Sequence, residues 1–149
     1  MKNNLSLLLC AVILFGKYSI ADKQMNDNNI IDLDFSQLQT VELYPVEDYP
    51  FMKVIDGDEP LAGGVTSFQS NDGKFDVGSS RYSKITLRLS DWPVDEFMYF
   101  LEGQVEITNE DGSSKIYGAG DAIVMPKGFN GIWRQLTPIK KINISYPME

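Results

Sequence analysis

The chain contains no histidine, and this absence excludes much of the chemistry that enzymes perform near neutral pH. Without an imidazole there is no Ser-His-Asp or Cys-His machinery and no histidine general base. Zinc, copper and non-haem iron sites lose their commonest ligand. An active site in these 149 residues must therefore use carboxylates, Lys, Arg, Tyr, Trp and backbone groups.

Cysteine and basic residues are also scarce. The single cysteine, Cys10, leaves no intramolecular disulfide and no cysteine-cluster metal site. The chain has 13 Lys and Arg residues against 21 Asp and Glu residues, a net charge of −8. Nucleic-acid surfaces need clustered basic residues, so we expect no nucleic-acid partner. The hydrophobic content of 43% is that of an ordinary globular protein of this length.

Residues 1–21 predict a signal peptide. Lys2 precedes an uncharged apolar run from Leu5 to Gly16, and Ser19-Ile20-Ala21 has small residues where a signal peptidase cleaves. The run is about 12 residues long, short of the roughly 20 that a membrane-spanning helix needs. We therefore expect cleavage after Ala21, a periplasmic or secreted location and no stable membrane insertion. An uncleaved anchor helix is the alternative.

Residues 22–39 are rich in Asp, Asn and Gln, and they predict a polar N-terminal arm before a single domain at 40–149. Scattered apolar side chains predict how the arm docks on that domain. The docking residues that we expect are Ile30, Ile31, Leu33 and Phe35.

From Thr40 onward the chain shows short apolar runs and period-two alternation, separated by Gly, Asp, Asn and Pro, and no helical period. This pattern predicts an all-β sandwich or barrel of jelly-roll type. The expected strands are 40–46, 51–55, 64–69, 74–77, 81–90, 95–102, 104–109, 114–118, 121–125, 131–136 and 139–146.

Two hairpins in residues 95–134 have a recognisable spacing. Glu96 is followed after six residues by Gly103, and Gly120 is followed after five residues by Pro126-Lys127-Gly128. Glycine at 103 suits a tight turn between antiparallel strands. These segments resemble the second half of the first cupin motif and the whole second cupin motif. The resemblance implies a cupin-type double-stranded β-helix, which is a jelly-roll barrel.

The longer stretch from Trp92 to Lys141 resembles one cupin subgroup, the small single-domain cupins of the (S)-ureidoglycine aminohydrolase cupin-domain (DUF861-type) family. Residues 64–75 also resemble the strand pair that precedes the motif there. The resemblance implies a barrel that is often assembled as a dimer, so a homodimer is one expected assembly. It does not imply a single shared activity.

In metal-binding cupins, a His-x-His pair precedes the motif glutamate and a third histidine follows the Pro-x-Gly. This chain has no histidine before Glu96, and Gly131 occupies the later position. The carboxylates of Asp91 and Asp95 could join Glu96 in an oxygen-only site, but solvated turn carboxylates are the simpler interpretation. We therefore expect no metal and no other cofactor, and the metal-dependent activity of the subgroup's namesake is not transferred. Gly131 is expected to leave room inside the barrel.

Strand alternation predicts what fills that interior. Met98 and Phe100 share a face with Glu96, whereas Phe97, Tyr99 and Leu101 lie on the opposite face. We predict a pocket with Glu96 as candidate catalytic acid or base. The ligand-binding candidates are Met98, Trp133, Gln135 and Lys141. The alternative is that these side chains simply fill the barrel, as in many small barrels.

A buried Glu96 needs a cationic partner or a proton. The candidate partners are Arg81, Arg88, Lys127, Arg134 and Lys141, and a structural ion pair at the barrel rim is the plain alternative. Three functions remain open: binding of a small polar molecule without metal chemistry, acid–base catalysis by Glu96, and a non-catalytic structural or dimerisation module.

Overall fold

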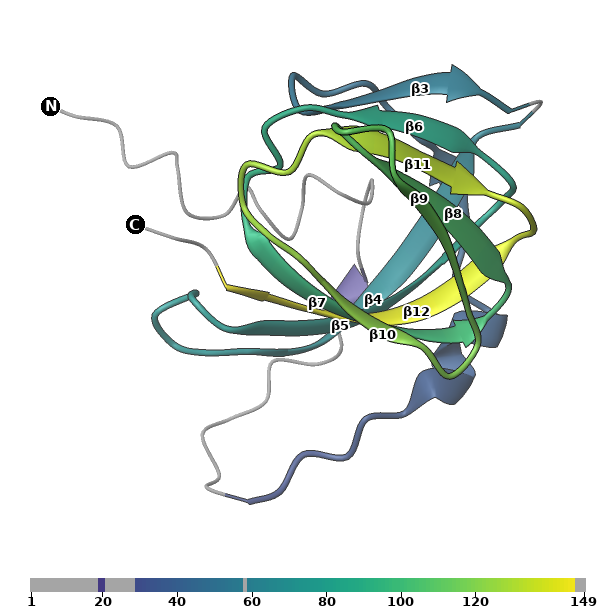
Figure 1. Cartoon of the computed structure of the whole chain (residues 1–149). Coiled ribbons are helices and arrows are strands. Elements are labelled where there is room, and N and C mark those ends of the chain that lie inside the picture. Colours follow the sequence, from purple (N-terminus) through teal and green to yellow (C-terminus); the bar gives the residue numbers. More distant parts are fainter. Residues whose placement is uncertain (1–18, 21–28, 58, 147–149) are drawn as a thin grey trace, which may run out of the picture.

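Two sheets form the body of the protein in a computed structural model, which describes residues 19–20, 29–57 and 59–146. The first sheet has the order β1-β4-β5-β12-β7-β10, with β2 also beside β4, and the second has the order β3-β6-β11-β8-β9. Figure 1 shows them curving around a common interior. Apart from the parallel β1–β4 pair, all strand pairs are antiparallel. The all-β prediction and the jelly-roll architecture are confirmed.

The elements, in chain order, are β1 (Ser19–Ile20), η1 (Phe35–Gln39, a 3-10 helix), β2 (Tyr44–Pro45), β3 (Met52–Asp56), β4 (Leu61–Gln69), β5 (Asp76–Tyr82), β6 (Thr86–Leu89), β7 (Asp95–Glu102), β8 (Gln104–Asn109), β9 (Ser114–Gly118), β10 (Ala122–Met125), β11 (Gly131–Gln135) and β12 (Ile139–Tyr146).

The expected strand 81–90 is wrong as a single strand. Here β5 continues to Tyr82 in one sheet, and β6 begins at Thr86 in the other sheet. Between them the Ser83 N–H donates to the Leu61 carbonyl, and the Ile85 carbonyl accepts from Gln135 N–H. The chain crosses between the sheets at this point, which alternation alone did not reveal. The expected strand 40–46 shrinks to the two residues of β2.

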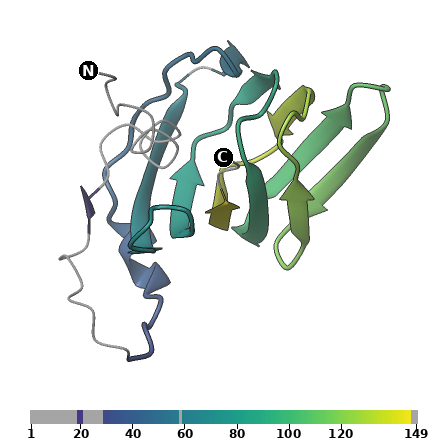
Figure 2. The same ribbon diagram turned by 90° about the vertical axis from the view of Figure 1, so that its left-hand side faces the viewer.

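The arm docks through a residue that the sequence did not single out. Leu38 in η1 is 1% exposed, and Arg81 Nη1 donates to the carbonyls of Leu38 and Gln39, each at 3.1 Å. Ile30 is 95% exposed and Leu33 is exposed too, so the expectation that these two dock on the domain is wrong. Ile31 and Phe35 are half-buried. Figures 1 and 2 show the blue-purple segment before η1 extending away from the sheets.

The predicted signal peptide lies almost wholly outside the described residues. Of its residues only Ser19 and Ile20 are described, and they pair with Val65 and Thr66 of β4. No helix in the described segments is long and apolar enough to span a bilayer.

The apolar core lies between the two sheets. Its most deeply buried large side chains include Phe100 and Met98 from β7, Val105 from β8 and Ile139 from β12. The turn between β7 and β8 depends on Gly103, which has φ 84°, and a Cβ there would collide with the Pro138 carbonyl. Glycine is therefore required at this turn, as its motif position predicts.

Candidate functional site

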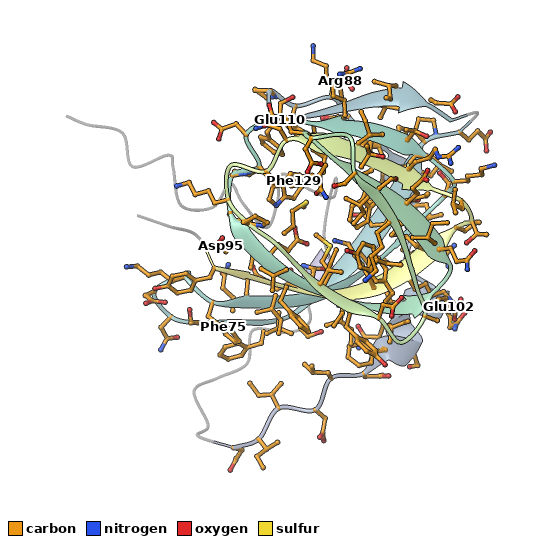
Figure 3. The ribbon with its side chains drawn as sticks, in the orientation of Figure 1. Phe75, Arg88, Asp95, Glu102, Glu110 and Phe129 are labelled. Atoms are coloured by element: carbon orange, nitrogen blue, oxygen red, sulfur yellow. The ribbon has the colours of Figure 1, made fainter. Side chains whose placement is uncertain are left out.

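Strand β7 places Glu96 inside the barrel. Its inward-facing residues Glu96, Met98 and Phe100 are between 0% and 1% exposed, whereas Phe97 and Tyr99 are 39% and 37% exposed on the outer side. The predicted alternation is confirmed. Glu96 lies opposite Ser145 of β12 and Met125 of β10. In Figure 3, Asp95 and Glu102 mark the two ends of β7, with Phe129 near the Asp95 end. We call this end the barrel mouth.

Lys141 is the partner of Glu96. Its Nζ lies 2.9 Å from Glu96 Oε1, and the two side chains are 5% and 0% exposed. The same Nζ is 3.2 Å from Met98 Sδ. The rings of Trp133 and Tyr82 lie 5.7 Å and 6.0 Å from it, within cation–π range. A carboxylate, a thioether and two aromatic rings therefore surround this ammonium group.

The other predicted cationic partners are engaged elsewhere or exposed. Arg81 holds η1, and Arg134 pairs with Glu106 on the outside of the second sheet. Arg88 is exposed and points away from the barrel in Figure 3, and Lys127 is exposed at the mouth. Because Glu96 is fully buried, the pair is an interior one and not the rim pair that was the plain alternative.

Gln135 fixes the ring of Trp133. With its amide oriented to suit its neighbours, the side-chain oxygen accepts from Trp133 Nε1 at 3.1 Å and the nitrogen donates to the Ser83 carbonyl. Gln135 is 1% exposed and Trp133 is 4% exposed. The indole N–H of Trp133 is thus hydrogen-bonded within the protein, and the ring itself lies near the ammonium group of Lys141.

Tyr82, at the end of β5, is a third group around the ammonium. Burial raises the pKa of its phenol well above 10.0, and the nearby Glu96 carboxylate raises it further. The Ser80 hydroxyl lowers it in part. This phenol therefore stays protonated at neutral pH.

Four buried side-chain polar atoms have no hydrogen-bond partner among the described residues: Ser80 Oγ, Trp92 Nε1, Glu96 Oε2 and Asn143 Oδ1. Trp92 is 4% exposed and Glu96 is 0% exposed. A buried polar atom without a partner is costly and needs a reason, such as bound water or a ligand. For Trp92, whose side chain lines a small cavity, that cavity gives one.

The four predicted ligand-binding residues meet around one small internal cavity. Met98, Trp133, Gln135 and Lys141 line it together with Met52, Tyr82, Leu87, Leu89, Trp92 and Met125. Its volume is about 30 Å³, room for a water molecule. Pockets for metabolites are typically about 300–1,000 Å³. The predicted side chains therefore converge, but they leave no preformed space of metabolite size in this conformation.

Aromatic side chains close the mouth. The ring of Trp92 meets Phe51 edge-to-face at 5.5 Å, and Phe51 stacks on Tyr49 at 5.6 Å. The backbone of Trp92 is clamped to the β10–β11 loop by its N–H donating to the Phe129 carbonyl at 3.1 Å and its carbonyl accepting from Gly128 N–H at 2.7 Å. The sequence pattern does not place Trp92 at the mouth, because its position depends on contacts between distant loops.

Residues 88–142 match the family model described as an EutQ-like cupin domain. The match supports the cupin superfamily for this part of the chain. Solved structures agree on the fold. The Clostridium difficile EutQ protein has a TM-score of 0.55 at 17% identity, over 83% of this chain and 98% of that chain. The polyketide cyclase RemF from Streptomyces resistomycificus has a TM-score of 0.54 at 17% identity, over 75% of this chain and 77% of that chain.

A DUF861-family protein of unknown function from Pseudomonas syringae pv. tomato has a TM-score of 0.61 at 18% identity, over 70% of this chain and 43% of that chain. The chain therefore spans less than half of that relative's length. No curated protein matches. At these identities the likeness shows the fold alone, and the narrower resemblance to the ureidoglycine aminohydrolase subgroup stays a prediction.

The donor set of this chain does not fit the metal that metal-binding cupins hold. No group of three or more His, Cys, Asp and Glu side chains gathers in the described part of the chain. Asp91 is exposed, and Asp95 Oδ1 accepts from the Lys127 backbone N–H at 2.9 Å. The ammonium of Lys141 already occupies one oxygen of Glu96. The three carboxylates of the proposed oxygen-only set therefore do not converge.

Gly131 does not leave room inside the barrel, so that expectation is wrong. A Cβ built on Gly131 would collide with the Thr108 carbonyl and lie 2.7 Å from the Phe129 ring. The space that a ligand histidine would need is filled by these two groups. Glycine at 131 thus reflects a close packing of β8, β11 and the mouth loop.

Proposed function

We propose that this cupin binds a small polar molecule in its barrel without a His-ligated metal, and that the aromatic residues of the mouth move to admit it. The buried Glu96–Lys141 pair carries the proposal. Burying two charges costs several kcal/mol per ion, and an apolar pair of similar volume is often as stable or more so. Stability of the fold alone therefore gives little reason for an ion pair at this depth.

The atoms around the pair support the same proposal. Trp92 Nε1 has no partner among the described residues and its side chain lines the cavity, whose mostly apolar wall also carries Gln135 and Lys141. Fixed polar groups on an apolar wall are typical of small-molecule sites. Because the two charges balance each other, a neutral molecule with both hydrogen-bonding functions suits the interior best. A periplasmic or secreted location remains part of this proposal.

The methionines offer a direct test. Met52, Met98 and Met125 line the cavity, and they are half of the six methionines in the chain. Protein with carbon-13 methionine methyl groups should be titrated with small amides, sugars, amino acids and carboxylic acids, and with divalent ions. We expect saturable shifts of the three lining signals with one class, and weaker binding in Glu96→Gln.

A matched control is Glu106→Gln, which alters the Arg134 pair outside the barrel. This variant should bind as the natural chain does. If no class shifts the lining signals, or if Glu96→Gln binds with unchanged affinity, the barrel is a sealed structural unit and the proposal fails. Thermal shift gives an independent measure, since a ligand that binds only the folded state raises its stability.

Acid–base catalysis by Glu96 is the second candidate function. The burial of its carboxylate and the unpartnered Oε2 favour it, because a catalytic group needs a free atom shielded from water. Substrates would be organic acids, sugars or amides. Once a ligand is known, Glu96→Gln should lower kcat far more than it raises KM. Equal turnover in this variant would exclude the acid–base role.

A further inference from the structure

The inner side of the first sheet carries a group of buried polar side chains that do not line the small cavity. They lie on three neighbouring strands, β5, β12 and β7, at the lower side of Figure 1. We call this group the polar floor and define it as Asp76, Asn143, Ser145 and Glu96. The first three are each 7% exposed and Glu96 is 0% exposed. Of the four, only Glu96 is a predicted site residue.

Strand register brings the four side chains of the polar floor together. Ser145 lies directly between Asp76 on β5 and Glu96 on β7. Asn143 is two residues before Ser145 on the same strand, so it is diagonal to both carboxylates, and diagonal neighbours on one side of a sheet are within reach of each other. Two strand spacings separate Asp76 from Glu96, so their backbones are about 10 Å apart. The floor therefore presents two carboxylates with an amide and a hydroxyl between them.

Two oxygen atoms of the polar floor are buried acceptors without a donor. Glycine at position 78 lets the amide of Asn143 lie against β5, because a Cβ built there would be 3.4 Å from Asn143 Nδ2 and 3.7 Å from Oδ1. This Oδ1 has no hydrogen-bond partner among the described residues, and the same is true of Glu96 Oε2. Buried polar atoms are rarely left in this state, so both oxygens point to a donor supplied from outside the chain.

Asp76 adds a carboxyl group that lacks a counter-charge. Its Oδ2 accepts from Gln69 Nε2 at 3.3 Å, and that amide is neutral. No Lys or Arg of the described segments forms an ion pair with Asp76, whereas Lys141 neutralises Glu96. A buried carboxylate without a counter-charge costs stability. Stability of the fold therefore gives no reason for an aspartate at this position.

We propose that the polar floor binds the ammonium group of a small primary amine, with Asp76 as its counter-charge and Asn143 Oδ1 as acceptor of one of its N–H groups. An ammonium group has three donors and no acceptor, which matches a surface whose acceptors lack donors. It also brings the one positive charge that balances Asp76. The rest of the molecule extends over Ser145 toward Glu96 Oε2.

This inference rests on the proposed function, because an amine reaches the polar floor only if the barrel mouth opens. It narrows the class of ligand. The Glu96–Lys141 pair is neutral and suits an uncharged group, whereas Asp76, on the other side of β12, selects a positively charged one. An anion would be repelled by Asp76, and an alcohol would leave Asp76 without a counter-charge.

Nuclear magnetic resonance of the full chain tests the proposal, with propylammonium chloride at neutral pH as the probe. The readouts are the side-chain amide signals of Asn143 and the methyl signal of Met98, which lies opposite Asn143 on β7. We expect both to shift and to saturate. The same concentrations of 1-propanol or potassium chloride should leave them in place. Asp76→Asn should weaken binding roughly tenfold or more, because a charge-assisted contact is lost.

Asp72→Asn is the matched control, because it removes the same charge from the exposed turn between β4 and β5. This variant should bind propylammonium as the natural chain does. Asn143→Ala removes the proposed acceptor, and the Met98 signal should show weaker binding in that variant too. Circular dichroism checks that each variant folds.

The outcomes separate this inference from the proposed function. Equal affinity in the natural chain and Asp76→Asn, or an equal shift with potassium chloride, overturns the ammonium site. So does a neutral amide or sugar that shifts the Met98 signal when propylammonium does not, and binding in the barrel then still stands. If neither the amine nor any other class shifts that signal, both proposals fail.

Discussion

Lys141 Nζ and Glu96 Oε1 lie 2.9 Å apart with almost no access to solvent, whereas the neighbouring Lys140 makes its 2.8 Å contact to Glu102 on the outer side. The Glu102 side chain is 58% exposed. Two consecutive lysines of one strand thus make ion pairs of nearly equal length in opposite surroundings. Comparing what the two pairs contribute to stability therefore isolates the effect of burial on an ion pair.

The first prediction compares these two lysines. Lys141→Met should lower the free energy of unfolding by about 3–5 kcal/mol, because it leaves a buried carboxylate without its counter-charge. Lys140→Met should cost at most about 1 kcal/mol, as exposed pairs contribute little. Urea denaturation measures both. The double variant Glu96→Leu with Lys141→Met should recover most of the loss, and a double variant as unstable as Lys141→Met contradicts the argument.

The second prediction concerns pH. Burial raises the pKa of the Asp76 carboxyl above 3.8, with partial opposition from its hydrogen bond to Gln69. The folded state then holds this proton to a higher pH than the unfolded chain does. The free energy of unfolding therefore falls as pH rises between 3.8 and the folded pKa, and the loss is complete above it. Asp76→Asn should be more stable than the natural chain at neutral pH, with the advantage vanishing on acidification.

Asp72 supplies a control of opposite sign. A hydrogen bond from the Ser70 hydroxyl lowers the pKa of the Asp72 carboxyl below 3.8, and the group is fully exposed. Its stabilising effect is present above 3.8 and is lost as pH falls through the folded pKa. Asp72→Asn should be slightly less stable at neutral pH. Identical pH profiles for the two asparagine variants would count against the assigned causes.

The third prediction tests the support of Trp133. Gln135→Leu removes the acceptor of the indole N–H and the donor to the Ser83 carbonyl, so it leaves the N–H of the buried Trp133 side chain without its partner. The expected loss is about 1–3 kcal/mol of unfolding free energy, with a change in tryptophan fluorescence. Gln104→Leu on the exposed side of β8 should change stability by less than about 0.5 kcal/mol. Equal stability of both variants contradicts the role given to Gln135.

The fourth prediction separates two turn glycines. Gly103 and Gly120 have similar φ values, 84° and 90°, but a Cβ on Gly103 would collide with the Pro138 carbonyl and one on Gly120 meets nothing within 4 Å. Gly120→Ala should cost about 1–2 kcal/mol, the penalty of the left-handed conformation. Gly103→Ala should cost clearly more, because the backbone must also shift. Thermal melts of the two variants measure the stability that each one loses. Equal losses would show that the backbone near Gly103 avoids the collision at no extra cost.

Local pattern was enough to predict much of the fold and of the site. Period-two alternation placed Glu96, Met98 and Phe100 inside the barrel, and the Gly and Pro spacing predicted the hairpins. Asp121 illustrates how local such rules are, since its carboxylate accepts from Gly118 N–H three residues away at 2.8 Å. Lys141 was one of five candidate partners of Glu96, and the structure places it there.

Those local rules could not predict contacts between distant segments of the chain. The switch of sheets after Tyr82, the docking of Leu38 and the collision at Gly131 each depend on groups that meet only in the folded chain. The volume left beside Lys141 depends on how ten side chains pack, which no sequence period encodes. The same limit explains why the place of Trp92 at the mouth could not be predicted.

Strand β7 carries Glu96 and Met98 on its inner side and the exposed rings of Phe97 and Tyr99 on its outer side. Met98 contacts Lys141 Nζ and lines the cavity, and its two neighbours in the chain are those outward-facing aromatic residues. A molecule that enters the barrel and displaces Met98 therefore acts on the backbone that positions Phe97 and Tyr99. In such a protein, a spectroscopic probe on the outer side of β7 would report on the interior of the barrel.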